Sequence, residues 1–328
     1  MSVQARRVVA VFTSLSLLAG CATPLTRDGR IGSDDGSDSC RSQLVALDST
    51  GNFFAEDILK GAALGAVGGA LLGGAIGQNW RGAAIGAATG AAAGAAGGYL
   101  YAQQQRNKDQ ASLTASIAGD LERENAELDR TQLAFDQLMD CRFRQATAIR
   151  AGVANGSIDR AAGQAQMAQL RERTQREIAL AETISQSVNK RGAEFDTAVE
   201  TVAPGATKNV SRDTSFRNAQ ISRATPLRLR PDAASPEIGN VDARSAVKVR
   251  PVSANYALVE TASGQRGYVP TESFANRRAI GTAPVTRTAV PGDARSLAAS
   301  NIARRDNFSE SVTQAKTAAA SGFELAAS

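Results

Sequence analysis

Histidine is missing from this sequence, which excludes the side chain that most often serves as a general base and as a transition-metal ligand. Aromatic residues make up only 5% of the chain, so no folded unit is expected to have a large core. The sequence contains no Gly-x-Ser-x-Gly turn, no Walker loop and no cluster of metal ligands. We therefore expect no enzymatic activity, no catalytic residue, no metal site and no cofactor.

The N-terminus has the pattern of an export signal. Two arginines at positions 6–7 precede a mainly apolar stretch at 8–18, which is too short to cross a bilayer but long enough for a signal-peptide core. Residues 18–21 read Leu-Ala-Gly-Cys and resemble the lipobox of bacterial lipoproteins. The resemblance implies a signal peptide at 1–20, a fatty acyl group such as palmitate on Cys21, and sorting to the outer membrane, since Ala22 follows. The alternative is an ordinary secretory signal with an incidental cysteine.

Two further cysteines remain after the lipidated one. Residues 21–57 are rich in Asp, Ser and Gly and are expected to be a flexible tether, which carries Cys40. In an exported protein, Cys40 and Cys141 favour a disulfide, with an intermolecular bond or a free thiol as alternatives. Catalysis by Cys141 is not expected, because no histidine can activate it.

Glycine recurs every fourth residue in two runs separated by a short polar break. On a helix this period places the glycines on one slowly winding stripe, along which a second helix can approach closely. Such small-residue stripes pair helices in membranes, whereas in water each interior glycine costs a helix about 1 kcal/mol relative to alanine. The expected helix-packing positions are Gly61, Gly65, Gly69, Gly73 and Gly77 in the first run, and Gly82, Gly86, Gly90, Gly94 and Gly98 in the second.

These two runs resemble the glycine-zipper two-helix domain of outer-membrane lipoproteins such as the 17 kDa surface-antigen family. The uncharged stretches 61–80 and 82–105 are each long enough to cross about 30 Å of hydrocarbon. The resemblance implies a transmembrane helical hairpin over 58–105 that contacts membrane lipid, and a homo-oligomer could form through the zipper. A Gly/Ala-rich low-complexity linker is the alternative.

Residues 106–203 predict two long amphipathic or coiled-coil helices. Apolar side chains recur at heptad-like spacing through Leu121, Leu128 and Phe135, and again after residue 157. Gly152 and Gly156 interrupt the pattern between two arms of nearly equal length. We favour an antiparallel hairpin about 70 Å long over a single rod of twice that length.

Residues 219–276 change to short alternating stretches typical of half-buried strands. Their order resembles a bacterial SH3 (SH3b) domain, from the strand and loop at 227–235 to the Gly-Gln-Arg-Gly-Tyr-Val turn and strand at 264–269. The resemblance implies an SH3-like β-barrel that binds cell-wall peptides or glycans, although tyrosine stands where the family often has tryptophan. The candidate ligand contacts are Tyr256, Tyr268, Arg228, Arg230 and Arg266; the tyrosines could instead lie in the core, and the arginines could be solvated.

The C-terminal part of the chain is basic. Residues 204–328 contain seventeen Lys and Arg against ten Asp and Glu, a charge that would attract anionic glycans, carboxylates or lipid head groups. A nucleic-acid partner is not favoured, and a charge of this size more often serves solubility alone. Residues 277–328 are expected to be a mostly disordered tail with one weak helix after Ser296.

Together these patterns predict a multidomain α plus small β protein. The leading interpretation is a lipid-anchored envelope lipoprotein of structural or tethering role, in the outer membrane and facing the periplasm rather than in the inner membrane. Its SH3-like domain would bind peptidoglycan or a protein partner. The alternatives are a zipper oligomer that forms a pore or perturbs the membrane, and an adaptor that recruits an envelope protein through its coiled coil.

Overall fold

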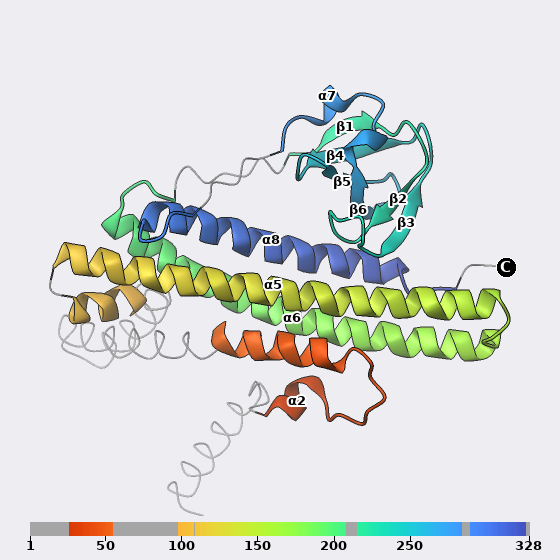
Figure 1. The fold of residues 1–328 in the computed structure, drawn as a ribbon, viewed down its shortest axis with the longest axis horizontal. Coiled ribbons are helices and arrows are strands. Elements are labelled where there is room, and N and C mark those ends of the chain that lie inside the picture. The colour runs from red at the N-terminus through yellow and green to blue at the C-terminus, as the bar shows by residue number, and fades with distance from the viewer. Residues whose placement is uncertain (1–25, 55–97, 108, 208–214, 284–288, 326–328) are drawn as a thin grey trace, which may run out of the picture.

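The computed structural model describes residues 26–54, 98–107, 109–207, 215–283 and 289–325. Its longest elements are α5 (Gln110–Ala154) and α6 (Arg160–Val202), which pack side by side as an antiparallel hairpin (Figure 1). Asp109 and Asp159 cap the two helix starts by accepting hydrogen bonds from backbone N–H groups of the first turn. Gly156 adopts a φ of 76° in the connecting turn, a conformation that glycine reaches without steric cost. The chain therefore forms a hairpin and not a single rod.

A third helix, α8 (Ala294–Ser321), packs against both arms of this hairpin (Figure 1). Phe308 on α8 is fully buried and contacts Phe135 of α5 edge-to-face, with ring centroids 5.8 Å apart. α8 contains the weak helix expected after Ser296, but it is a long helix packed on the bundle rather than a weak one in a mostly disordered tail. The reason is that polar side chains on the buried face hide its apolar periodicity. Those buried polar side chains are Ser300, Asn301, Arg305 and Gln314.

The N-terminal part also folds onto the bundle. A short helix α2 (Arg27–Ile31) is followed by a helix over 41–54, and residues 98–106 form another helical segment. Leu44, Leu47 and Phe54 occur at helical spacing, and all three are buried. The flexible tether expected for 21–57 is thus an ordered arm from residue 26 to residue 54.

Six antiparallel strands form a second unit, the β module (residues 215–283). Its sheet order is β1-β4-β5-β6-β2-β3, and its core contains Val249, Val259 and Val269. After the last strand come a short 3-10 turn, η2 (Thr271–Ser273), and α7 (Arg277–Ile280). The strands are β1 (Arg217–Gln220), β2 (Thr225–Arg228), β3 (Glu237–Val241), β4 (Ala246–Pro251), β5 (Tyr256–Glu260) and β6 (Arg266–Pro270).

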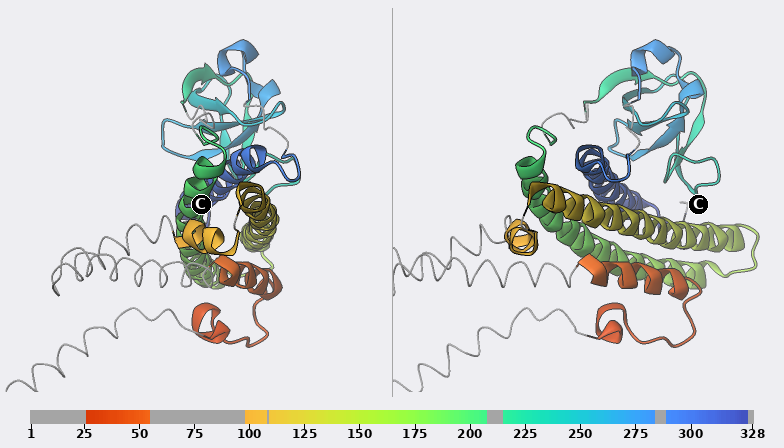
Figure 2. Two further views of the ribbon diagram at one scale, coloured as in Figure 1. Left: turned by 90° about the vertical axis from the view of Figure 1, so that its left-hand side faces the viewer. Right: turned by 60° about the vertical axis from the view of Figure 1, so that its left-hand side comes forward.

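The sheet is open, because β1 and β3 are its two edges and do not pair with each other. The link between β2 and β6 is a single residue pair, Arg228 with Tyr268, beside an irregularity in the β2–β3 register. The described residues therefore form a mixed helical and antiparallel-sheet protein with an open sheet, where the sequence indicates a closed SH3-like barrel. Figure 2 shows that the module lies along α8.

Most of the glycine-rich segment, expected to be a transmembrane hairpin at 58–105, lies outside the described residues. Within the ranges given above, no helix combines the length and the apolar character that a membrane span needs.

Candidate functional site at the base of the glycine-rich segment

The residues just before and just after the segment 55–97 lie close together, toward one end of the helical bundle. Phe53 precedes this segment and Tyr99 follows it, and both contact the same part of α6. The guanidinium carbon of Arg191 lies 4.9 Å from the ring centroid of Phe53 and 5.8 Å from that of Phe195. The ring centroids of Tyr99 and Phe195 are 4.8 Å apart. One cation and three aromatic rings therefore hold the entry and the exit of the segment together.

Buried polar contacts fix this arrangement. Arg191 donates to Glu124 of α5 through Nε (3.0 Å to each carboxylate oxygen) and through Nη2 (2.6 Å to Oε2), and the Glu124 side chain is buried. The Tyr99 hydroxyl donates to Asp120 Oδ2 at 2.6 Å, and so does the Gln103 amide. Burial is the main reason why the pKa of Tyr99 is raised, and the hydrogen bond to Asp120 raises it further. The phenol therefore stays protonated and acts as a donor.

A cleft of about 580 Å³ opens beside this cluster. Phe53, two residues before position 55, and Gly98, directly after position 97, are both in its wall. The lining combines arginines with carboxylates. The arrangement is suited to holding two chain segments in place.

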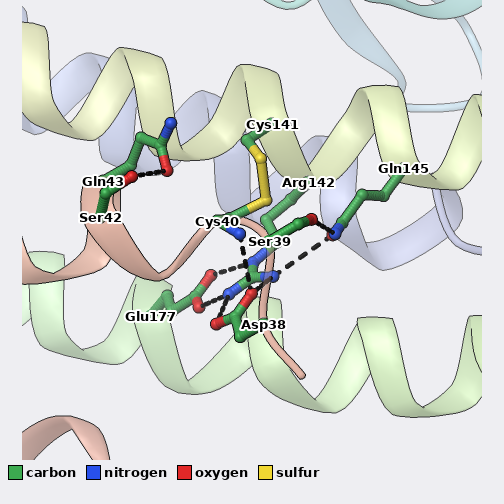
Figure 3. The surroundings of a disulfide bond; sticks show 9 residues. All are labelled: Asp38, Ser39, Cys40, Ser42, Gln43, Cys141, Arg142, Gln145 and Glu177. Carbon is green, nitrogen blue, oxygen red and sulfur yellow. Dashed lines mark hydrogen bonds and ion pairs between the residues drawn. A yellow bond between two sulfur atoms is a disulfide. The ribbon is translucent and has the colours of Figure 1, made fainter. Parts of the chain in front are cut away.

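A second junction fastens the N-terminal arm to the middle of α5. Cys40 and Cys141 form a disulfide, the pairing that the sequence favours over an intermolecular bond or a free thiol (Figure 3). Next to it, the Arg142 guanidinium lies between Asp38 of the arm and Glu177 of α6. Arg142 Nη1 and Nη2 donate to the two Asp38 carboxylate oxygens at 2.7 Å each, and Nε donates to Glu177 Oε2 at 2.9 Å.

This ion cluster is buried and holds two carboxylates for one guanidinium. Burial raises the pKa of Glu177 above its ordinary value, although the hydrogen bonds from Arg142 oppose the rise. Burial also works against the ionised form of Asp38, but hydrogen bonds from Arg142 and from the Cys40 N–H outweigh it and lower the Asp38 pKa. Both carboxylates depend on Arg142 for compensation, so the loss of that one side chain would be costly.

The expected ligand contacts of the β module are largely engaged within the protein. The Tyr268 side chain is buried and Tyr256 is half-buried. Arg228 donates to the Ser235 carbonyl at 2.8 Å, and Arg230 pairs with Asp140 of α5 through Nε and Nη2 at 3.1 and 2.5 Å. Arg266 stacks over the Phe216 ring at 5.5 Å and faces Glu260 at 3.8 Å. These contacts hold the module together and dock it against the helical bundle.

The remaining predicted positions are Cys21 and the glycines of the zipper. Cys21 and the zipper glycines up to Gly94 lie outside the described residues, whereas Gly98 is buried at the start of the 98–106 helix. The sequence reasoning missed Arg191 and the role of Arg142. A signal for Arg142 was present, because an arginine stands in the apolar seam of the first arm, directly after Cys141.

No three His, Cys, Asp or Glu side chains in the described ranges are placed to hold a metal ion. Among known families, residues 60–109 match the glycine zipper. Neither a curated protein nor a solved structure matches the chain. The zipper is of the outer-membrane type, which indicates an envelope-associated protein.

Proposed function

We propose that this chain is a membrane-anchored structural lipoprotein of the cell envelope, which carries its β module on a rigid helical bundle. The anchor consists of the glycine zipper, inserted as a helical hairpin, together with an acyl group on Cys21. In this role the bundle is a spacer, since α5 alone, at 45 residues, is about 68 Å long. No catalytic step is part of the proposal.

The observation that carries this proposal is the shared base of the glycine-rich segment. Phe53 and Tyr99 flank that segment and contact neighbouring α6 side chains: Phe53 packs under Arg191, and Tyr99 packs against Phe195, which the same Arg191 guanidinium covers. A hairpin of two equal helices in lipid needs its two ends side by side, and this junction supplies that condition. An extended linker would need no such closure.

Flotation with vesicles tests the anchor without the acyl group. The chain beginning at Ala22, oxidised and folded, is mixed with phosphatidylcholine vesicles and centrifuged through a density gradient. We expect it to float with the vesicles. The matched control replaces residues 58–97 with a Gly/Ser segment of equal length, which keeps the chain connection and the Cys40–Cys141 bond, and we expect it to stay at the bottom.

A second comparison isolates the glycine stripe. Ala62→Leu/Ala66→Leu/Ala70→Leu and Gly65→Leu/Gly69→Leu/Gly73→Leu both raise hydrophobicity, but only the second fills the stripe. We expect both variants to float, and only the glycine variant to lose the close pairing of the runs, measured by cross-linking between cysteines placed in each run. Failure of the non-acylated parent chain to float would refute the zipper as an anchor.

A further inference from the structure

The two halves of the Cys40–Cys141 bond differ in their access to solvent. Cys40 is fully buried, whereas Cys141 is half-buried. Cys141 also belongs to the wall of a cleft of about 430 Å³, which Gln43 lines from the arm and which Arg144 and Ala148, among other residues, line from α5. A reagent that enters this cleft therefore meets Cys141 and is kept away from Cys40.

The charge at this wall favours a negatively charged reagent. The Arg144 side chain is largely exposed and lies 3.6 Å from the Asp140 carboxylate. Both oxygens of Asp140 already accept hydrogen bonds from Arg230 of the β module. Two guanidinium groups thus face one carboxylate. Thiols attack disulfides as thiolate anions, so the reacting form of a thiol is attracted to this cleft.

The buried sulfur atom is placed to act as the leaving group. Cys40 directly precedes the helix over 41–54, and its carbonyl accepts a hydrogen bond from the Leu44 N–H at 3.2 Å. The positive end of a helix dipole stabilises an anion at such a position. Arg142 is close as well and compensates Asp38, because Asp38 Oδ1 accepts from both the Cys40 N–H (3.0 Å) and Arg142 Nη1 (2.7 Å) (Figure 3). Burial opposes a lasting charge, so a thiolate formed here takes up a proton or attacks again.

We infer that the Cys40–Cys141 bond is a site of thiol–disulfide exchange in the folded protein, which an external thiolate enters at Cys141 through this cleft. In the first step the thiolate bonds to Cys141 Sγ and the bond between the two cysteines breaks. Its electron pair leaves on Cys40 Sγ, which then takes up a proton. In the second step another thiolate attacks the external sulfur of the mixed disulfide and releases Cys141. The protein disulfide is reduced to two thiols, and two external thiols are oxidised to a disulfide.

The arm is held by more than this bond, so exchange does not require it to leave the bundle. Leu44 and Leu47 are buried in the same apolar cluster as side chains of α5 and α6. Asp38 accepts hydrogen bonds from Arg142 at 2.7 Å through each of its oxygens. These contacts stay in place when the sulfur atoms separate. Reduction thus opens the covalent ring around the glycine-rich segment while the arm keeps its position.

Reduction kinetics with glutathione test whether the folded protein reacts. The chain that begins at Ala22 contains Cys40 and Cys141 as its only cysteines, and in detergent micelles its reaction does not depend on membrane insertion. We expect the rate of reduction to rise in proportion to the glutathione concentration and to stay unchanged in about 1 M urea. A rate that levels off with glutathione, or that rises steeply with urea, would show that the bond is reached only after unfolding and would overturn the inference.

Trapping the intermediate tests which sulfur is attacked. Acid added early in the reaction stops the exchange and preserves the mixed disulfide, which peptide mass spectrometry then locates. We expect glutathione on Cys141 at least about ten times as often as on Cys40, because access decides which sulfur reacts. Glutathione on Cys40, or on both residues equally, would contradict entry at Cys141.

A matched pair of variants tests the cleft as the route. Gln43 lines the cleft, whereas its neighbour Ser42 is exposed and is not among the lining residues. We expect Gln43→Trp to slow reduction about tenfold by filling the cleft, and Ser42→Trp to react like the parent. Urea denaturation of the oxidised chains shows whether each variant is folded. If Gln43→Trp does not fold, Ala148→Trp obstructs the cleft from α5 and should slow reduction in the same way. Reduction of a folded cleft variant at the rate of Ser42→Trp would exclude this route.

Discussion

The buried ion cluster at Arg142 allows a quantitative prediction for Arg142→Met. The substitution keeps an apolar stem of similar length but leaves Glu177 buried and without the guanidinium. Glu177 can avoid a buried charge only by taking up a proton, and its ordinary pKa is 4.5. Protonating such a group at pH 7 costs about 3.4 kcal/mol, at 1.36 kcal/mol per pH unit. The same cost at pH 5 is only about 0.7 kcal/mol.

We therefore expect Arg142→Met to lower the free energy of unfolding by about 3 kcal/mol at pH 7 and by under about 1 kcal/mol at pH 5. The sign follows because a carboxyl whose folded-state pKa is raised contributes stability at low pH and loses it as pH rises. Asp38 adds to the loss in the same direction, since it too is no longer paired. Urea denaturation of the oxidised chain in detergent, followed by circular dichroism at pH 5, 6 and 7, measures both values.

Two companion variants make this test specific. Arg142→Met/Glu177→Gln removes the stranded charge and should recover part of the loss at pH 7 with little dependence on pH. Arg176→Met removes an exposed arginine that pairs with Glu172 one turn away, and should cost less than about 0.5 kcal/mol at every pH. A loss for Arg142→Met that is equally large at pH 5 and pH 7 would refute the reasoning from a stranded carboxylate.

Three further predictions follow from the contacts described. Cys40→Ser opens a covalent ring with a sequence separation of 101 residues and should lower the free energy of unfolding in urea by about 4–5 kcal/mol. A variant as stable as the oxidised parent would contradict a role for the bond. Burial raises the pKa of Asp136 to about 6 from 3.8, so stability should fall as pH rises through this window. Asp136→Asn should then stabilise the chain by up to about 3 kcal/mol at pH 7.5 and flatten the pH profile. A methyl group on Gly192 would overlap the Arg305 guanidinium. Gly192→Ala should therefore destabilise the packing of α8 by about 1–3 kcal/mol and speed the amide exchange of this helix. The control Gly119→Ala in α5 should do neither, because its methyl group would meet no neighbour.

The elements with regular apolar periodicity could be predicted from the sequence. Leu121, Leu128 and Phe135 are buried, and the helices end and begin around the glycine-containing turn. The alternating stretches expected as strands within 219–276 include β2, β4, β5 and β6. β1 lacks the alternation because it is an edge strand with mostly exposed side chains, so no apolar pattern marks it.

The elements that were missed bury polar groups or depend on distant partners. Asn301 of α8 is buried and donates to Asn125 of α5, and Arg305 donates to Asp196 of α6. These partners lie far away in the sequence, so reading α8 alone gives a weak helix in a polar tail. The same holds for the arm, whose half-buried Asp38 pairs with the buried Arg142 only in the folded protein. The hydrogen-bonding partners of such polar residues come from distant parts of the chain, so these residues show no apolar periodicity in the sequence.

The placement of the two junctions has a mechanical consequence for the glycine-rich segment. The Cys40–Cys141 bond closes a ring that contains the whole segment, and the contacts of Phe53 and Tyr99 with α6 close a smaller ring inside it. Force applied to the outward face of the β module reaches α5 and α8 through the ion pairs Arg230–Asp140 and Arg250–Glu310. From α5 the covalent bond transmits it to the arm, and so toward the part of the chain that we propose is anchored. A load-bearing spacer needs such a continuous path, whereas a flexible tether between residues 26 and 54 would have interrupted it.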